Sequence, residues 1–154
     1  PVVCVKYMSP YKTEYTDWRA GLNVPALRYS DVLLIAAEAI MNLNGGGPSN
    51  RATGIAAAAA PFNLVRVRAG LAPITAPTFN DLMYERRMEL AFEGGDRHFD
   101  LVRWELAESI YNALPAEGTY KPVRSYIPSR HRLLPYPQGE IDNSNGSIKQ
   151  NPNY

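Results

Sequence analysis

The sequence is poor in the residues that most often build catalytic, metal or disulfide sites. Its 154 residues include one cysteine, Cys4, and two histidines, His98 and His131. A single cysteine excludes an internal disulfide and a cysteine-based zinc site. No run of about eighteen apolar residues is present, so we expect no helix that crosses a bilayer. The first residue is Pro1 rather than Met, which predicts a cut or processed piece of a longer chain.

The net charge is also small. Lys and Arg number 16 and Asp and Glu 15, so the net charge is +1. A general nucleic-acid binder needs a basic patch, and this balance argues against a nucleic-acid partner. Hydrophobic residues make up 45% and charged residues 20%, as in one globular domain. Twelve of the 16 basic residues are Arg, which favours bidentate ion pairs and hence salt-bridge networks within the molecule.

Apolar periodicity predicts four helices, and therefore a mostly α fold of two successive helical hairpins. The first helix begins near Ser30 or Asp31, either of which can cap it, and ends at the glycines from Gly45 onward. The second runs from about residue 51 to 69, and Pro61 should kink or split it. Gly70 and the apolar residue after it should close this helix in a Schellman ending.

The second hairpin carries a sharper start signal. Thr78 followed by Asp81 resembles a capping box, and the third helix should run from there to Gly94. The fourth opens near Asp96 and carries one apolar stripe as far as Leu114. Both ends of the chain read as long irregular segments: residues 1–28 as a strand and loop of the same domain, and residues 115–154 as Pro-, Gly- and Asn-rich chain.

A row of carboxylates is the strongest chemical signal. Glu85, Glu89 and Glu93 are spaced four apart and would share one face of a helix. One interpretation is a divalent-metal or acid/base site, but the Glu-x-x-His pairs of a di-iron bundle are missing. The favoured interpretation is a structural ion-pair network, with no metal or cofactor. Its predicted members are Glu85, Arg86, Arg87, Glu89, Glu93, Arg97 and Arg103.

Aromatic residues gather near the N-terminus, at Tyr7, Tyr11, Tyr15 and Trp18. Aromatic faces stack on sugar rings, and Tyr and Trp add a polar tip, so Tyr11, Tyr15 and Trp18 are candidate ligand-binding residues. The alternative, favoured from the sequence, is a loop whose aromatic side chains pack onto the core. Spacing alone does not separate the two.

A hydrolytic site has little support. Ser129 lies near His131 in the sequence, but no Gly-x-Ser-x-Gly elbow is present. The glycine run at residues 45–47 lacks the Lys and Ser/Thr of a phosphate loop. We therefore expect no enzyme and no catalytic residue.

Several blocks of sequence, taken together, resemble the SusD/RagB family. They occur in the family's order from about residue 27 to the end of the chain, and a collinear match of this kind is specific. The blocks are LRYSDVLL with AEA (27–39), NLVRVRAGL (63–71), ERRMELAFEG (85–94), RHFDLVRW (97–104), and LPYPQGEID with QNPNY (134–154). Ser30, Gly95 and Pro61 depart from the family's usual pattern.

The resemblance implies a fold, a place and partners. It implies tetratricopeptide-like helical hairpins, with residues 29–154 as the C-terminal domain of a protein about three times longer. Family members are lipid-anchored on the outer face of the bacterial outer membrane, bind glycans or other nutrients, and cover a SusC-like TonB-dependent transporter barrel. They are not enzymes. The anchoring cysteine belongs at the N-terminus of the full protein, so that role does not pass to Cys4.

Two other function classes stay open at this point. One is a helical-repeat scaffold that binds a protein partner and no small ligand. The other is a hydrolase, for which Glu85 or His131 would have to be essential.

Overall fold

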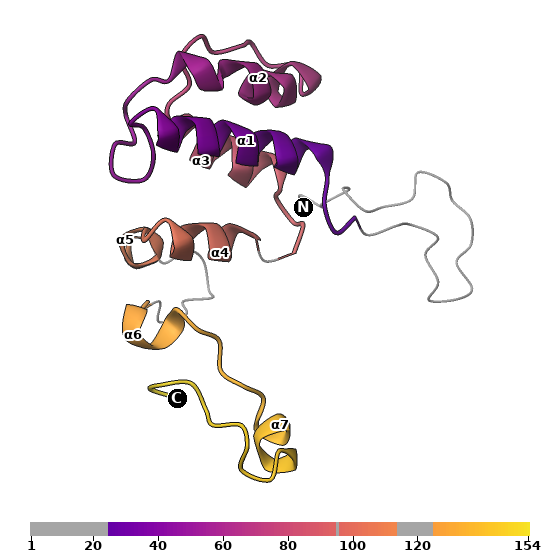
Figure 1. Cartoon of the computed structure of the whole chain (residues 1–154), viewed down its shortest axis with the longest axis vertical. Helices are drawn as coiled ribbons and strands as arrows, with labels where there is room; N and C mark the ends of the chain where they lie inside the picture. Colours follow the sequence, from indigo (N-terminus) through magenta and orange to yellow (C-terminus); the bar gives the residue numbers. More distant parts are fainter. Residues whose placement is uncertain (1–24, 95, 114–124) are drawn as a thin grey trace, which may run out of the picture. The chain divides into compact units, whose positions relative to one another are not determined.

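The described helices confirm a mostly α fold. The structure, a computed structural model, describes residues 25–94, 96–113 and 125–154. All regular elements within these ranges are helical (Figure 1). In chain order they are α1 (Tyr29–Leu43), the 3-10 turn η1 (Ala56–Ala58), α2 (Ala59–Arg68), α3 (Phe79–Glu89), α4 (Asp96–Arg103), α5 (Ala107–Asn112), α6 (Pro128–His131) and α7 (Gln138–Asn143). None of these helices is long and apolar enough to cross a membrane.

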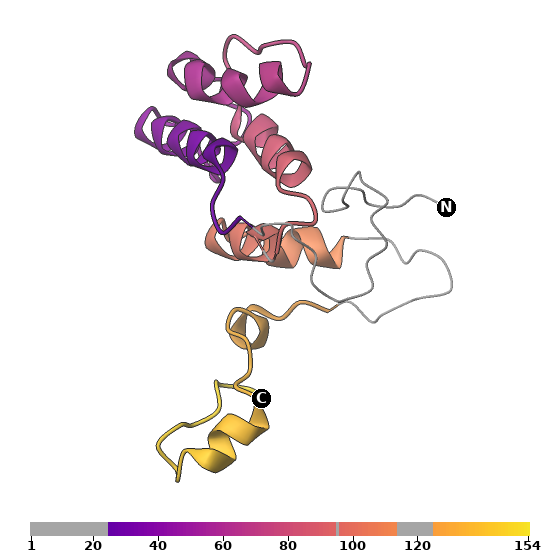
Figure 2. The same cartoon turned by 90° about the vertical axis from the view of Figure 1, so that its right-hand side faces the viewer.

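The chain divides into two compact units, Pro1–Arg97 and His98–Tyr154. In the first unit α1 packs against both α2 and α3. Figure 2 shows α2 lying over α1 and α3. Buried apolar side chains from all three helices fill the space between them, and burial of each Leu, Met, Phe or Val among them stabilises the fold by about 1.5–3 kcal/mol. They include Leu34, Ala37, Met41, Phe62, Val65, Phe79 and Leu82.

The start of α1 corrects the sequence analysis. Arg28 occupies the N-cap position, and no side chain caps the helix. Ser30 and Asp31, the predicted caps, lie inside the first turn. Ser30 is buried, and the Asp31 carboxylate accepts a hydrogen bond from Arg86 on α3. Tertiary contacts therefore use the residues that a local rule assigns to capping.

The sequence predicts that Pro61 kinks or splits a helix, but it does neither. It is the third residue of α2, after a 3-10 turn. The first turn of a helix has no intrahelical partners for its N–H groups, so proline costs no hydrogen bond there. The other end of α2 is as predicted: Gly70 has φ +75°, and the Leu71 N–H donates to the Arg66 carbonyl at 2.9 Å. This is a Schellman ending.

The predicted capping box of α3 is confirmed. The Thr78 hydroxyl accepts from the Asp81 N–H at 3.1 Å, and the Asp81 carboxylate accepts from the Thr78 N–H at 2.8 Å. The helix ends earlier than predicted, at Glu89, and Phe92 adopts a left-handed φ of 63°. Glu93 therefore lies beyond the helix and not on its continuous face.

The predicted fourth helix is two helices. Glu105 adopts φ +58° between α4 and α5, and the Leu106 N–H donates to the Leu101 carbonyl at 2.9 Å. The apolar stripe continues through this break, so periodicity did not reveal it. Part of the C-terminal segment also differs from the expectation, because α6 and α7 are short helices. Proline occupies the first position of α6 and the N-cap of α7.

Candidate functional site

The carboxylates of Glu85 and Glu89 are almost removed from solvent. Both lie on α3, and their side chains expose 4% and 8% of their surface. A buried carboxylate without a cationic partner would be costly to keep charged, so each must be paired. The partners come from α2 and from the residue before α1.

Arg28, at the N-cap of α1, bridges two of the carboxylates. Its Nη1 donates to Glu89 Oε1 at 2.9 Å, and its Nε donates to Glu93 Oε2 at 2.7 Å. A third bond runs from Nη2 to the Glu89 carbonyl at 2.9 Å. One guanidinium thus fixes the end of α3 and the turn after it against the start of α1.

Two arginines of α2 complete the network. Arg66 Nη1 donates to Glu85 Oε2 at 2.9 Å, and Arg68 Nη2 donates to Glu89 Oε2 at 2.6 Å. The residues of each pair are 19 and 21 positions apart in the sequence. These bonds tie α2 to α3.

The ionisation of Glu89 reflects two opposing effects. Burial acts to raise the pKa of Glu89, because it disfavours the charged carboxylate. The hydrogen bond from Arg28 and the positive charge of Arg68 outweigh burial, so the pKa of Glu89 lies below its ordinary value. The hydrogen bond to Glu93 is the main reason that the pKa of Arg28 is raised. Both groups are therefore charged at neutral pH.

One further ion pair has the opposite arrangement, because the arginine is the more deeply buried partner. Arg86 of α3 donates through Nη1 to Asp31 Oδ1 of α1 at 2.8 Å. The Arg86 side chain exposes 6% of its surface and Asp31 exposes 20%. This pair connects α1 directly to α3.

The four predicted arginines lie in different settings. Arg86 is buried against α1, whereas Arg87 is exposed and has no ion pair among the described residues. Arg97 is half-buried at the start of α4. Arg103 donates to Asp100 on its own helix at 2.8 Å and lies over the Trp104 ring.

Arg28, Arg66 and Arg68 were not predicted from the sequence to pair with the glutamates. All three lie in the sequence blocks that resemble the SusD/RagB family, and this resemblance was the signal that could have identified them. Arg66 also donates to the Ala72 carbonyl, while the Asn63 amide exchanges two hydrogen bonds with the Ile74 backbone. The block that contains these residues therefore holds the loop after α2 in place.

The network offers no metal site within the described residues. No group of three His, Cys, Asp or Glu side chains that could hold an ion occurs there. The glutamate oxygens instead face guanidinium groups at 2.6–2.9 Å. This arrangement can brace helices, and its carboxylates are already used as ion-pair partners.

The candidate ligand residues Tyr11, Tyr15 and Trp18 lie outside the described residues. The structure therefore does not test them, and their role stays a prediction.

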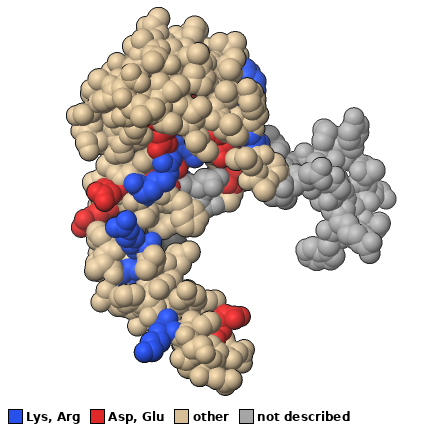
Figure 3. All heavy atoms as spheres, viewed as in Figure 1, with Lys and Arg blue, Asp and Glu red and all other residues tan. Residues whose placement is uncertain are grey.

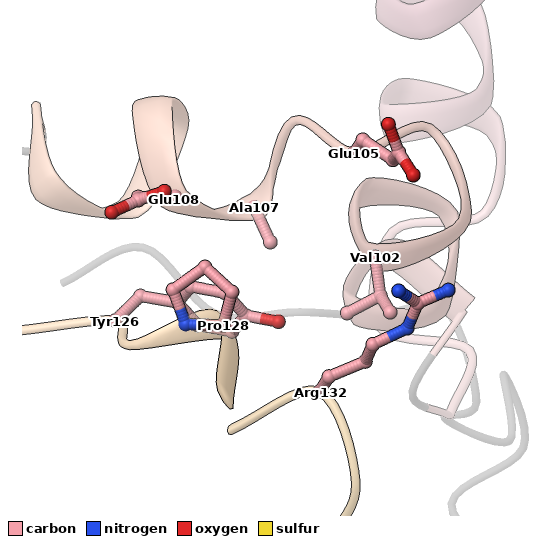
Figure 4. Close-up of a pocket in the computed structure, with 7 residues that line it drawn as sticks. All are labelled: Val102, Glu105, Ala107, Glu108, Tyr126, Pro128 and Arg132. Carbon is pink, nitrogen blue, oxygen red and sulfur yellow. The ribbon is translucent and has the colours of Figure 1, made fainter. Parts of the chain in front are cut away.

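The second unit contains a cavity of about 200 Å³. Its lining includes Val102, Glu105, Ala107, Glu108, Tyr126, Pro128 and Arg132. Figure 4 shows Glu105 and Arg132 at one end of the cavity and Glu108 at the other. Two carboxylates and one guanidinium supply acceptors and donors for a hydroxylated molecule.

The two histidines take part in an aromatic cluster of the second unit. His98 Nδ1 lies 3.1 Å from the Tyr111 hydroxyl, and the His98 and Tyr111 rings are stacked. His131 packs beside Tyr126, and its Nδ1 accepts from the Ile127 N–H at 2.8 Å. Among the described residues no serine hydroxyl bonds to either histidine. The geometry gives a hydrolytic triad no support.

Comparison with known proteins gives a consistent result. The sequence profile of the SusD family matches residues 2–154. SusD-like protein P2 from Formosa agariphila is 28% identical over 149 residues, which cover 88% of this chain and 26% of that protein.

Two solved structures resemble this one. Surface glycan-binding protein A from Bacteroides thetaiotaomicron has a TM-score of 0.66 at 35% identity, covering 86% of this chain and 25% of that one. Surface glycan-binding protein A from Bacteroides uniformis has a TM-score of 0.66 at 32% identity, covering 84% of this chain and 28% of that one. The chain thus spans about a quarter of the length of these relatives.

Proposed function

The chain belongs to the SusD family, and we propose that it forms the C-terminal part of a cell-surface protein that binds glycans and delivers them to an outer-membrane transporter. The observation that carries this proposal is the pair of similar solved structures, both described as surface glycan-binding proteins and both more than 30% identical. The profile match over residues 2–154 supports the same assignment.

The role we infer for this part of the protein is mechanical. Ion pairs of Arg28, Arg66 and Arg86 connect α3 to α2, to α1 and to the residue before α1. A helical unit whose interhelical angles are fixed moves as one body. A cover that opens and closes over a transporter needs such a body, because bending within it would uncouple ligand binding from movement.

The place and the partner follow from the family. We propose that the complete protein lies on the outer face of the outer membrane, held by a lipid anchor outside this chain, and that it covers a SusC-like TonB-dependent transporter barrel. Co-purification of a membrane-extracted transporter with the tagged complete protein tests this part. A protein recovered alone from gently solubilised membranes would contradict it.

Two places in the chain are proposed to contact the glycan. Tyr11, Tyr15 and Trp18 supply aromatic faces for sugar rings. The cavity of the second unit supplies the Glu108 carboxylate and the Arg132 guanidinium for hydroxyl groups.

Affinity electrophoresis of the complete protein in gels containing soluble plant and algal polysaccharides tests glycan binding. At least one polysaccharide should retard the wild-type protein. Trp18→Ala and Arg132→Ala should each reduce the retardation, while Lys149→Ala, an exposed change outside both places, should not. Wild-type mobility unchanged in every gel would overturn the proposed function, whereas retardation unaffected by the variants would reject only these contacts.

We also propose that the protein has no enzymatic activity. Glu85, the carboxylate on which the hydrolase alternative depends, is buried in an ion pair with Arg66. A screen with chromogenic glycosides and esters should show no turnover. Activity that disappears on changing Glu85 or His131 would contradict this proposal.

A further inference from the structure

Helix α1 carries apolar side chains on its outward side as well as on its inward side, where Leu34, Ala37 and Met41 are buried. Ser30 and Glu38 are buried, and Asp31 is paired with Arg86. The exposed side chains include Tyr29 and Leu43, which expose 73% and 85% of their surface. A helix whose outer side faces water carries polar side chains on that side.

The outward residues form one continuous seam. Tyr29, Val32, Ala36, Ala39 and Leu43 follow each other at alternating spacings of three and four residues. All five are exposed or half-exposed, and Val32 exposes 42% of its surface. This spacing is that of the a and d positions of a coiled coil, so the seam is as wide as one partner helix.

No charged side chain interrupts the seam. The charged residues of α1 are Asp31 and Glu38, and neither belongs to it. Figure 3 shows the surface over α1 and α2 in this view as almost entirely free of Lys, Arg, Asp and Glu. Contiguous exposed apolar surface of this kind marks a contact surface.

The size of the central residues indicates the partner. Ala36 and Ala39 occupy the middle of the seam, while the larger Tyr29 and Leu43 lie at its ends. Small residues at the centre let two helix backbones approach closely. The seam therefore fits a helix with an apolar stripe of its own better than it fits an extended peptide.

The relatives indicate where such a helix comes from. The matched region is about a quarter of their length, so about three quarters of a protein of this kind lies outside it. We propose that the outward seam of α1 is buried in the complete protein against a helix from the part that precedes this chain. The inference rests on the proposed function only in assigning the chain to the C-terminal part of a longer protein.

Burial of this kind places α1 at the centre of a larger helical array. It contacts α2 and α3 on its inner side and the incoming helix on its outer side. The Arg86–Asp31 pair would then transmit movement of the preceding helices directly to α3. The C-terminal part and the part that precedes it would then move together.

Cysteine labelling in the complete protein tests the proposal. Ala39→Cys lies in the middle of the seam, and Ser49→Cys, on the exposed loop after α1, is the matched control. Because labelling of a buried thiol requires local opening, we expect a maleimide to react at least about tenfold more slowly at position 39 than at position 49. Peptide mass spectrometry distinguishes both sites from Cys4 and from other cysteines. Equal rates would overturn the proposal.

A second measurement excludes other occupants. The labelling is repeated on the complete protein after size-exclusion chromatography with light scattering, without the transporter. Protection found in the isolated monomer supports a helix of the same chain. Protection found only in a dimer, or only with the transporter bound, would overturn the proposal in favour of a second copy or of the barrel. Neither result depends on glycan binding, so failure of the proposed function remains distinguishable.

Discussion

The first unit and the C-terminal residues 125–154 are held together by different forces. In the first unit three helices share a buried apolar core, and ion pairs provide further contacts to α3. Among residues 125–154, all of which are described, none is buried. Their structure comes from hydrogen bonds that side-chain amides make to the backbone.

The amide contacts have a regular form. Gln150 accepts from the Tyr136 N–H at 2.8 Å and donates to the Tyr136 carbonyl at 3.0 Å. Asn151 donates to the Leu134 carbonyl at 2.6 Å, and Asn153 to the Ser129 carbonyl at 2.7 Å. The last five residues thus bind the chain that precedes α7. We define these contacts as the amide clasp.

The contacts of the two regions therefore determine different properties: global stability in the first unit and local conformation in the amide clasp. Removal of apolar surface from water and pairing of buried charges affect the free energy of the whole unit. Hydrogen bonds exposed to water contribute little to that free energy, because water replaces each lost partner. Changes in the first unit should therefore alter global unfolding, and changes in the amide clasp should alter only local opening.

The largest expected effect is at Glu89. Replacing it with alanine removes one of the two carboxylates that pair with the half-buried Arg28 guanidinium, and it also removes the bond to Arg68. Breaking a buried ion pair by removing one partner costs about 3–5 kcal/mol. Urea unfolding followed by far-UV circular dichroism should show this loss for Glu89→Ala.

Arg87→Ala is the control for this change. Arg87 is two residues away on the same helix and is exposed. Its replacement should alter the free energy of unfolding by less than about 0.5 kcal/mol. A similar small effect for Glu89→Ala would mean that the network is a solvated surface and does not brace the helices.

Acid should weaken the same contact. The pKa of Glu89 is lowered in the folded protein, from an ordinary value of 4.5. Its ion pairs therefore stabilise the fold above that pH, and the contribution is lost as the pH falls through the lower folded pKa. The urea midpoint should fall from pH 5 to about pH 3 more steeply in the wild type than in Glu89→Gln. Glu108→Gln, an exposed change, should keep the wild-type slope, and equal slopes in all three proteins would contradict this assignment.

Features encoded within a few residues could be predicted from the sequence. The Thr78–Asp81 capping box spans three positions, and Gly70 marks its helix end by itself. The helical fold class followed from apolar spacing in the same way. The capping box and the helix end at Gly70 depend on hydrogen bonds between neighbouring residues, which form independently of distant parts of the chain.

The rest depends on contacts between distant parts of the chain. Arg28 and Glu89 are 61 residues apart, and no spacing rule connects them. Asp31 was predicted to cap α1, but Arg86 of α3 binds its carboxylate. The break at Glu105 was missed because a glutamate occupies a left-handed position that usually favours glycine.

A smaller effect on global stability is expected at the ends of α2 and α4. Gly70 and Glu105 hold the same position, with φ +75° and +58°. A side chain on left-handed backbone costs about 1 kcal/mol, and a Cβ at Gly70 would meet no atom within 4 Å. Gly70→Ala should thus lower the free energy of unfolding by about 1 kcal/mol, and Glu105→Gly should raise it by up to about 1 kcal/mol. Thermal unfolding measures both, and a lower melting temperature for Glu105→Gly would mean that its side chain makes a stabilising contact.

The smallest global effect is expected in the amide clasp. Gln150→Ala removes both hydrogen bonds to Tyr136. Because these bonds are exposed, the free energy of unfolding measured in urea should change by less than about 0.5 kcal/mol, while the Tyr136 amide should exchange with deuterium about tenfold faster. Lys149→Ala, exposed and adjacent, should leave both quantities unchanged. A fall in global stability as large as that of Glu89→Ala would show that the clasp supports the whole fold, and the distinction between the two regions would then be wrong.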